Sequence, residues 1–270
     1  MLRLVYQAET NVPVEVAGLV PHALRGKSAA EIERLPIAHG NASRPLAEFF
    51  AVSGDAADNR LEFAGNLAGV HWIGAHLAEG SIHVAGNAGR HVGSEMTGGE
   101  IHVAGDVSDW LGGEMHGGLI DVRGSAGDFT GAAYRGSKHG MTGGTLLVRG
   151  AAGNQIGHTM RRGLLAVGGC GDHAAINMIA GTILVFGPCG IRPAAGMRRG
   201  TVALLGGSSP ALLPTFRAGS REKLLALQLV LRELVRLDYP VPVELVDCDY
   251  RTYHGDLLTI GRGEILVPQR

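Results

Sequence analysis

Apolar residues recur along the middle of the chain with a period close to 19 residues. Six methionines stand in one column, and each is followed by an aliphatic residue at the fifth position and another at the seventh. Glycine occupies the third and ninth positions, and an earlier copy begins with Leu77 in the methionine's place. The methionines are Met96, Met115, Met141, Met160, Met178 and Met197. A fixed period with several columns in phase is typical of repeat proteins, whose stacked copies share one core.

The two aliphatic positions of each copy predict a short strand with one buried face, because they are separated by a single residue. The flanking glycines suit sharp turns in which φ is positive, and methionine can fill irregular gaps in a core. No aliphatic residue recurs every six residues, which disfavours a left-handed helix of the hexapeptide type. We therefore predict an all-β solenoid with minor α, a right-handed parallel β-helix of about seven 19-residue coils over residues 61–209.

The segments on either side of the repeat have a different character. Residues 1–60 contain Ser28 and Glu31, whose spacing predicts a helix that begins with a capping box, and we expect an N-terminal α/β cap. Residues 210–270 contain the apolar segment Ser220–Leu237, which predicts a helix, followed by strands. The outward positions of the repeat become apolar from about the fourth copy onward. We expect the helix to pack on that outer face; a subunit interface there is the alternative.

Composition excludes several classes of protein. The chain has 270 residues with 43 glycines and 5% aromatic residues, as a narrow, turn-rich solenoid requires. A formal net charge of −1 gives no reason to expect nucleic-acid or membrane-surface binding. The absence of a long apolar run and of a signal-peptide core favours a cytoplasmic protein. Cys170 and Cys189 lie one copy apart, and we expect two reduced core residues in preference to a disulfide.

Candidate catalytic residues are missing from the pattern. The sequence has no nucleophile elbow, phosphate-binding loop or paired acid and base, so no catalytic residue is assigned. His83, His102 and Asp121 share the outward column and are the nearest approach to a zinc site or to a β-helical enzyme's centre. We interpret them as solvated side chains of a strand ladder and assign no metal ligand.

Two arginine pairs occupy equivalent turns two copies apart. Arg161 and Arg162 follow one methionine of the column, and Arg198 and Arg199 follow another. Copies two apart are separated by about 10 Å in a stacked sheet, so the pairs predict a compact cationic patch. Guanidinium groups bind carboxylates and phosphates through two hydrogen bonds. Solvated turns without a ligand are the alternative.

One copy contains seven extra residues, in the segment Ala132–Gly140. Insertions in repeat proteins form loops on one face, which is often the binding face. Tyr134, Arg135, Lys138 and His139 are therefore candidate partner-contact residues. The alternative is a surface loop that has no binding role.

The copies from Leu77 to Gly206, with the pattern Met-x-x-Gly-x-(Ile/Leu/Val)-x-Val-x-Gly, resemble the C subunit of formylmethanofuran dehydrogenase. That family includes the bacterial version found in the formyltransferase/hydrolase complex. The interruption Gly136–Gly144 and the segment Arg251–Asp256, which we expect to be a turn between two strands, support the resemblance. The C-terminal domain of the large subunit of glutamate synthase shares only the glycine-rich repeat.

The resemblance implies a function for the complex and a supporting role for this chain. Such a complex converts formyl-tetrahydromethanopterin, through a formyl-methanofuran-type intermediate, to formate in the one-carbon metabolism of formaldehyde oxidation. Its implied partners are a formyltransferase subunit, a metal-dependent amidohydrolase-like subunit and a dehydrogenase-B-like subunit, in a hetero-oligomer. This chain would be a non-catalytic scaffold that itself binds no cofactor. Subunits of molybdenum or tungsten formylmethanofuran dehydrogenases and a glutamate synthase-like adaptor are the alternatives.

The resemblance also suggests a ligand for the arginine pairs. The furan coenzymes of the family generally carry glutamate-rich tails, which are polyanions. Arg161, Arg162, Arg198 and Arg199 would steer that tail between the active sites of the partner subunits.

Overall fold

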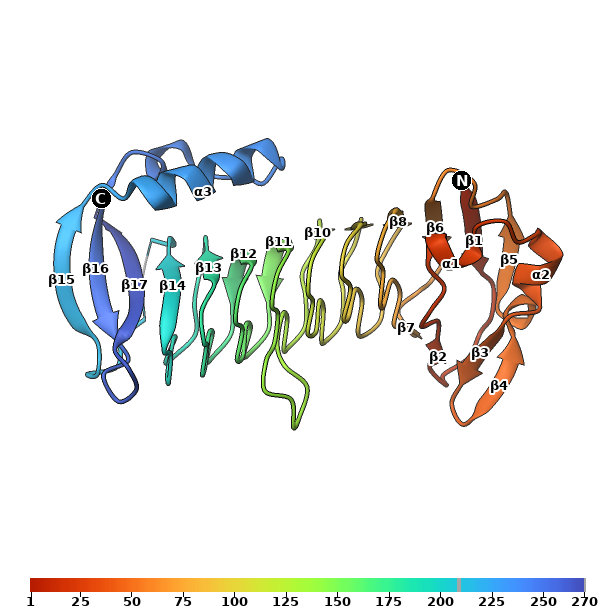
Figure 1. The fold of residues 1–270 in the computed structure, drawn as a ribbon, viewed down its shortest axis with the longest axis horizontal. Coiled ribbons are helices and arrows are strands. Elements are labelled where there is room, and N and C mark those ends of the chain that lie inside the picture. The colour runs from red at the N-terminus through yellow and green to blue at the C-terminus, as the bar shows by residue number, and fades with distance from the viewer. Residues whose placement is uncertain (208–209, 270) are drawn as a thin grey trace.

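The computed structural model describes residues 1–207 and 210–269 and is elongated, with its two termini at opposite ends (Figure 1). The described residues are mostly β, in one sheet of 13 strands and one of four strands. The α-helices among them are Pro21–Leu24 (α1), Ala29–Glu33 (α2) and Leu225–Arg236 (α3). This confirms the prediction of a β protein with a minor helical part.

Seven short strands form the middle of the large sheet, one in each predicted copy. They are Ser81–Val84 (β8), Glu100–Val103 (β9), Leu119–Val122 (β10), Thr145–Ala152 (β11), Leu164–Cys170 (β12), Thr182–Val185 (β13) and Arg199–Leu204 (β14). Neighbouring strands are parallel and in register, so that Ile82 lies beside Ile101 and Val84 beside Val103. All four side chains are buried. The two aliphatic columns of the sequence therefore become two continuous rows of the core.

A second row of parallel contacts lies outside these strands. Isolated bridges join Leu67 to Ala88, Ala88 to Val107, and Val107 to Ala126. Each bridge links equivalent positions of successive copies. The copies thus stack along more than one side.

The glycine at the third position of each copy adopts a backbone conformation that side chains disfavour. At Gly118, φ is +87°, and a Cβ atom there would lie 2.6 Å from the carbonyl oxygen of Gly99 in the preceding copy. The equivalent glycines with positive φ are Gly80, Gly99, Gly118, Gly144, Gly163, Gly181 and Gly200. This column is glycine because both the left-handed turn and the close approach of the copies exclude a side chain.

The N-terminal segment extends the large sheet and adds a small one. Leu2–Tyr6 (β1) and Arg60–Ala64 (β6) are parallel neighbours, and β6 also pairs with β8. Phe50–Ser53 (β5) pairs antiparallel with β1 and ends the sheet. The predicted capping box of Ser28 is present at the start of α2. The four-stranded sheet consists of Val14–Glu15 (β2), Pro36–His39 (β3), Ala42–Pro45 (β4) and Val70–His71 (β7), and Leu46–Glu48 (η1) is a short 3-10 helix.

The C-terminal segment departs from the sequence prediction in two places. Arg217–Glu222 is a strand (β15), so the predicted helix Ser220–Leu237 begins only at Leu225. The predicted turn Arg251–Asp256 falls largely within Asp249–Gly255 (β16), which pairs antiparallel with both β15 and Arg262–Gln269 (β17). Pairing between distant segments overrides the local preference in both cases. Val243–Leu245 (η2) is a 3-10 helix.

The apolar helix α3 lies on the outer face of the later strands, as the sequence predicts (Figure 1). Its residues Leu227, Leu231 and Leu234 are buried. They belong to a second hydrophobic cluster, separate from the interior core. The outward strand residues in that cluster are Leu147, Ala166, Leu184, Ala203 and Leu205. Burial of this face explains why its outward positions are apolar.

The predicted boundary at residue 209 lies outside the described residues, as does residue 270. None of the helices in the described ranges combines the length and the apolar character needed to cross a membrane.

Candidate functional site

The predicted cationic patch divides between two neighbouring hollows. Arg161, Arg162 and Arg199 line an open hollow of about 430 Å³. All three are exposed, no described carboxylate pairs with them, and no acidic residue lines the hollow. The structure therefore brings three of the four arginines together at a surface with uncompensated positive charge.

The fourth arginine, Arg198, lines the adjoining hollow, of about 520 Å³. Lys138 and His139 of the insertion also line it, together with neutral polar side chains. Ile179 lines both hollows, so they adjoin. The arginine pairs and the inserted loop, which are separate in the sequence, thus meet on one surface.

Tyr134 plays a different part from the rest of the insertion. Its hydroxyl donates a hydrogen bond to Ser94 Oγ at 2.7 Å and lies 3.0 Å from His91 Nδ1. Its ring stacks on that of Trp110, with the ring centroids 4.8 Å apart. Its backbone N–H donates to Glu114 Oε1 at 2.8 Å. Tyr134 therefore fastens the base of the loop to the body of the protein, and its contact with a partner stays a prediction.

The exposed part of the loop follows Tyr134. Arg135 and Lys138 are exposed and His139 is half-buried. Figure 1 shows the loop projecting beyond the row of turns between β10 and β11. Contact with a partner through these three residues stays a prediction.

An aromatic ladder, formed by Trp72, His91, Trp110 and Phe129, runs across four successive copies. The Trp72 and His91 rings are stacked with centroids 4.0 Å apart, and those of Trp110 and Phe129 are 4.6 Å apart. All four side chains are half-buried, and their backbone φ angles are between 62° and 65°. The Tyr134 ring also stacks on that of Trp110, so Tyr134 lies beside the ladder.

Sequence reasoning missed this ladder, although a signal was present. Trp72, His91 and Trp110 each stand five residues before the methionine-column residue of their copy, which is Leu77, Met96 or Met115. Phe129 stands twelve residues before Met141, because the seven extra residues lie between them. An aromatic column in phase with the repeat predicts stacked rings. The positive φ angles of these residues are invisible in the sequence, since such residues rarely adopt them.

His91 of the ladder and the neighbouring Tyr134 are both uncharged at neutral pH. Burial lowers the pKa of the His91 imidazole to about 4. Burial likewise raises the pKa of the Tyr134 hydroxyl to about 12. The His91–Tyr134 hydrogen bond therefore joins two uncharged groups, and neither is suited to exchange a proton near pH 7.

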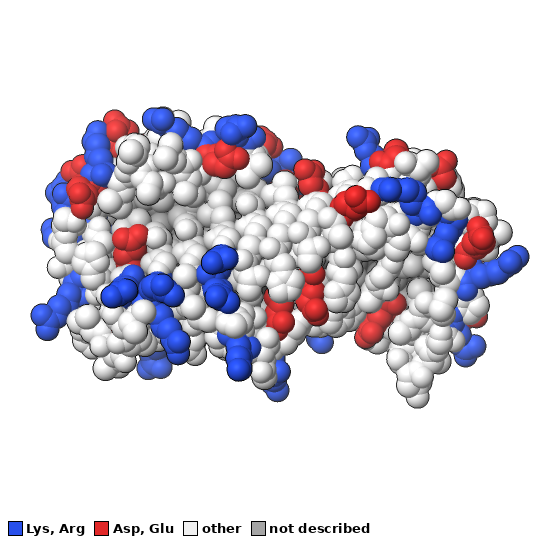
Figure 2. All heavy atoms as spheres, in the orientation of Figure 1, with Lys and Arg blue, Asp and Glu red and all other residues white. Residues whose placement is uncertain are grey.

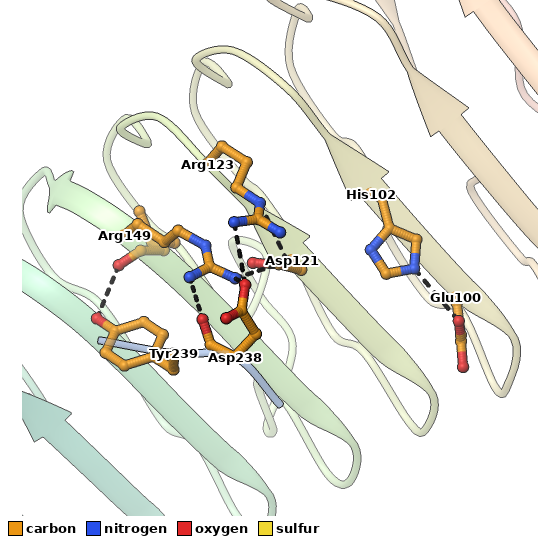
Figure 3. A network of polar contacts seen from close by, with 8 residues as sticks. Glu100, His102, Asp121, Arg123, Arg149, Asp238 and Tyr239 are labelled. Carbon is orange, nitrogen blue, oxygen red and sulfur yellow. Dashed lines mark hydrogen bonds and ion pairs between the residues drawn. The ribbon is translucent and has the colours of Figure 1, made fainter. Parts of the chain in front are cut away.

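The outward column that includes His102 and Asp121 does not converge on one point (Figure 3). His102 Nε2 lies 3.2 Å from Glu100 Oε2. Asp121, in the next strand, is 7% exposed and accepts a hydrogen bond from Arg149 Nη2 at 3.1 Å. In the part of the chain that the structure describes, no three His, Cys, Asp or Glu side chains are grouped so as to hold a metal ion.

The network around Asp121 attaches the end of α3 to the sheet (Figure 3). Arg149 contacts both the carboxylate and the backbone carbonyl of Asp238. The Tyr239 hydroxyl donates a hydrogen bond to the carbonyl of Val148 at 3.0 Å. These contacts are structural, because they join the residues after α3 to strand β11.

The paired cysteines are free thiols. Cys170 and Cys189 lie in adjacent copies, joined by a parallel bridge, with their Sγ atoms 3.5 Å apart. They remain two stacked, half-buried side chains.

Comparison with known proteins places the chain in a family. It matches the family model described as the GXGXG motif over residues 63–211, more than half of its 270 residues. The chain therefore belongs to the GXGXG-motif family, whose members carry this glycine repeat.

Similarity to a solved structure identifies a narrower family within this one. The chain is similar to a chain in the crystal structure of the formyltransferase/hydrolase complex from Methylorubrum extorquens in complex with methylofuran. The two are 36% identical with a TM-score of 0.93, and the match covers 99% of this chain and 100% of that one. The chain is a member of the family that comprises the C subunits of formylmethanofuran dehydrogenases and of this complex, which confirms the resemblance seen in the sequence.

Curated relatives match over shorter segments. The C subunit of a molybdenum-containing formylmethanofuran dehydrogenase of Methanosarcina barkeri is 37% identical over 93 residues, 33% of this chain and 31% of the relative. The C subunit of a tungsten-containing enzyme of Methanothermobacter thermautotrophicus is 36% identical over 88 residues, 31% of this chain and 33% of the relative. The chain thus matches about a third of the length of each of these two relatives.

Proposed function

We propose that this chain is the non-catalytic scaffold subunit of a formyltransferase/hydrolase complex. The observation that carries the proposal is the full-length similarity to a chain of such a complex, at a TM-score of 0.93. The complex would convert formyl-tetrahydromethanopterin, through a formyl-methanofuran-type intermediate, to formate in the cytoplasm.

The proposal includes the shape of the scaffold. The parallel register of β8–β14 and the bridges on a second side support a right-handed parallel β-helix of about seven coils. Residues 1–60 would form its cap, residues 61–209 the coils, and residues 210–270 the extension with α3. A rod of this kind offers several faces along its length, on which partner subunits can be held at fixed spacing.

The partners would be a formyltransferase subunit, a metal-dependent amidohydrolase-like subunit and a dehydrogenase-B-like subunit. Tyr134, Arg135, Lys138 and His139 would contribute to one contact. Arg161, Arg162, Arg198 and Arg199 would guide the glutamate-rich tail of a methanofuran-type coenzyme. Their uncompensated charge supports this role, because such a surface attracts a polyanion from a distance.

Purification of the tagged chain from its native host tests the proposed function. We expect formyltransferase and amidohydrolase-like subunits to co-purify, and the eluate to release formate from formyl-tetrahydromethanopterin. Mass spectrometry identifies the subunits, and metal analysis distinguishes this complex from a molybdenum or tungsten dehydrogenase. Recovery with a flavin and iron–sulfur protein would instead support a glutamate synthase-like adaptor, and a chain that elutes alone would contradict the proposal.

Replacing the four arginines of the two hollows by alanine is expected to slow formate release, measured at subunit concentrations at which the variant complex is fully assembled. The kcat/KM for formate release should fall about tenfold at low ionic strength, and by about twofold at 1 M salt, because salt screens long-range attraction. A control variant removes the same charge from four exposed arginines elsewhere and should keep wild-type turnover. Those four are Arg3, Arg44, Arg232 and Arg236. Unaltered turnover of the first variant at both salt concentrations would exclude a role in guiding the tail.

A further inference from the structure

An apolar tip protrudes from the C-terminal end of the molecule, in the loop that joins β16 to β17. Its members, Leu257, Leu258 and Ile260, are 48%, 82% and 55% exposed. Single exposed aliphatic side chains are common, whereas three within four residues form a patch that water does not favour. A loop of this size normally carries polar residues.

Hydrogen bonds join the loop that carries the tip to the residues before β14. Asp256 is 3% exposed, and its carboxylate accepts hydrogen bonds from the backbone N–H groups of Gly196 and Leu258, each at 3.0 Å. The Thr259 hydroxyl donates to the carbonyl of Met197 at 2.6 Å. The buried Asp256 carboxylate and the Thr259 hydroxyl therefore bond to the body of the protein, while the three aliphatic side chains are exposed. Such preorganisation reduces the entropy lost when a surface is bound.

A cationic collar, formed by Arg198, Arg199 and Arg262, lies beside the tip. Arg199 and Arg262 are register neighbours in β14 and β17, and the Arg262 N–H donates to the Arg198 carbonyl at 3.3 Å. None of the three guanidinium groups pairs with a described carboxylate. Figure 2 shows Lys and Arg residues gathered at the end of the molecule where Figure 1 draws the β16–β17 loop.

We propose that the apolar tip is an anchor that inserts into a hydrophobic socket, rimmed by Asp or Glu residues, on another protein subunit of the same complex. The inference rests on the proposed function, because it takes the occupant from that complex. Aliphatic anchors that are buried at the centre of an interface contribute most of its binding energy. The collar around the anchor selects a partner with acidic groups and accelerates the encounter.

A protein socket fits the tip better than a membrane surface does. Side chains that anchor proteins at membrane interfaces are typically Trp and Tyr, which are absent from the tip. The hydrogen bonds that join Asp256 to Gly196 and Thr259 to Met197 hold the loop backbone in one arrangement, which suits a shaped pocket and gives no advantage in a fluid bilayer.

The test measures binding of the purified full chain to the remaining subunits of its complex. The variant Leu258→Ser/Ile260→Ser changes the anchor and leaves the loop's inward bonds and the collar intact. Its matched control is Leu225→Ser/Leu229→Ser on α3, where the side chains are 69% and 57% exposed. We expect the dissociation constant of the tip variant to rise at least tenfold, that of the control to stay within twofold, and both to unfold at the wild-type urea concentration.

A third variant examines the collar. Arg262→Ala lies outside the arginines assigned to the coenzyme tail, and we expect it to lower the association rate at low salt but not at high salt. Equal affinity of the tip variant and the wild type would overturn the anchor, as would an equal loss in the control. The anchor would also be overturned, in favour of a membrane contact, if the wild type bound anionic phospholipid vesicles and the tip variant did not. A wild-type chain that binds none of the subunits would refute the proposed function itself.

Discussion

Replacing Gly118 by alanine is expected to lower the free energy of unfolding by about 4 kcal/mol. Two effects add. An alanine at φ +87° pays the strain of the left-handed region, and its Cβ would lie 2.6 Å from the Gly99 carbonyl oxygen. That oxygen belongs to the backbone of the preceding copy, so the clash is relieved only by separating two stacked strands. Urea unfolding followed by circular dichroism measures the change.

Gly136→Ala provides the matched control. Its φ is +89°, but no atom lies within 4 Å of the Cβ position. We therefore expect a loss of only about 1 kcal/mol, from backbone strain alone. Equal losses at Gly118 and Gly136 would show that strain, and not the close approach of the copies, requires glycine in this column.

Replacing Arg149 by alanine is expected to destabilise the protein by about 3 kcal/mol. Asp121 is 7% exposed, and Arg149 is its closest cationic partner at 3.1 Å. Without the guanidinium, a buried charge is left poorly paired, and the residues after α3 lose their contact with the sheet. The loss should persist at high salt, because buried pairs are screened weakly.

Arg123→Ala is the comparison for that pair. Its guanidinium faces the same carboxylate at 3.7 Å but is 54% exposed, so we expect a loss below about 1 kcal/mol. Adding Asp121→Asn to the Arg149→Ala variant should restore part of its stability, since the unpaired charge is then gone. Similar losses for the two arginine variants would contradict the burial argument.

The repeat could be predicted from the sequence because its signals are local and repeated. Each copy places two aliphatic residues one position apart, and the parallel register then aligns Ile82 with Ile101. The apolar outer face and the helix that covers it were also readable, because both surfaces had to be buried together. Seven copies of one pattern outweigh the weak preference of any single residue.

The C-terminal strands could not be predicted in the same way. Arg217–Glu222 is charged and mostly exposed, with no alternation that marks a strand. It becomes β15 only because β16 lies beside it. Likewise, β17 joins β14 in parallel across more than fifty intervening residues.

The placement of the candidate site residues was predictable in part. The arginine pairs were found because they repeat, and three of them share a hollow. The stacking of the Tyr134 ring on Trp110 could not be predicted, because it joins the insertion to a copy that lies earlier in the chain. The meeting of Lys138 with Arg198 depends on how the loop folds back, which spacing along the chain does not encode.

Strand β15 also bears on the behaviour of the protein at high concentration. A long, in-register parallel sheet is the arrangement through which proteins template fibrils, and an unpaired edge is where another chain would add. Here one edge is a strand that carries Arg217, Arg221 and Glu222 on an exposed surface. A neighbouring molecule would have to bring its own strand against these charges. This edge of the sheet therefore disfavours the addition of another chain.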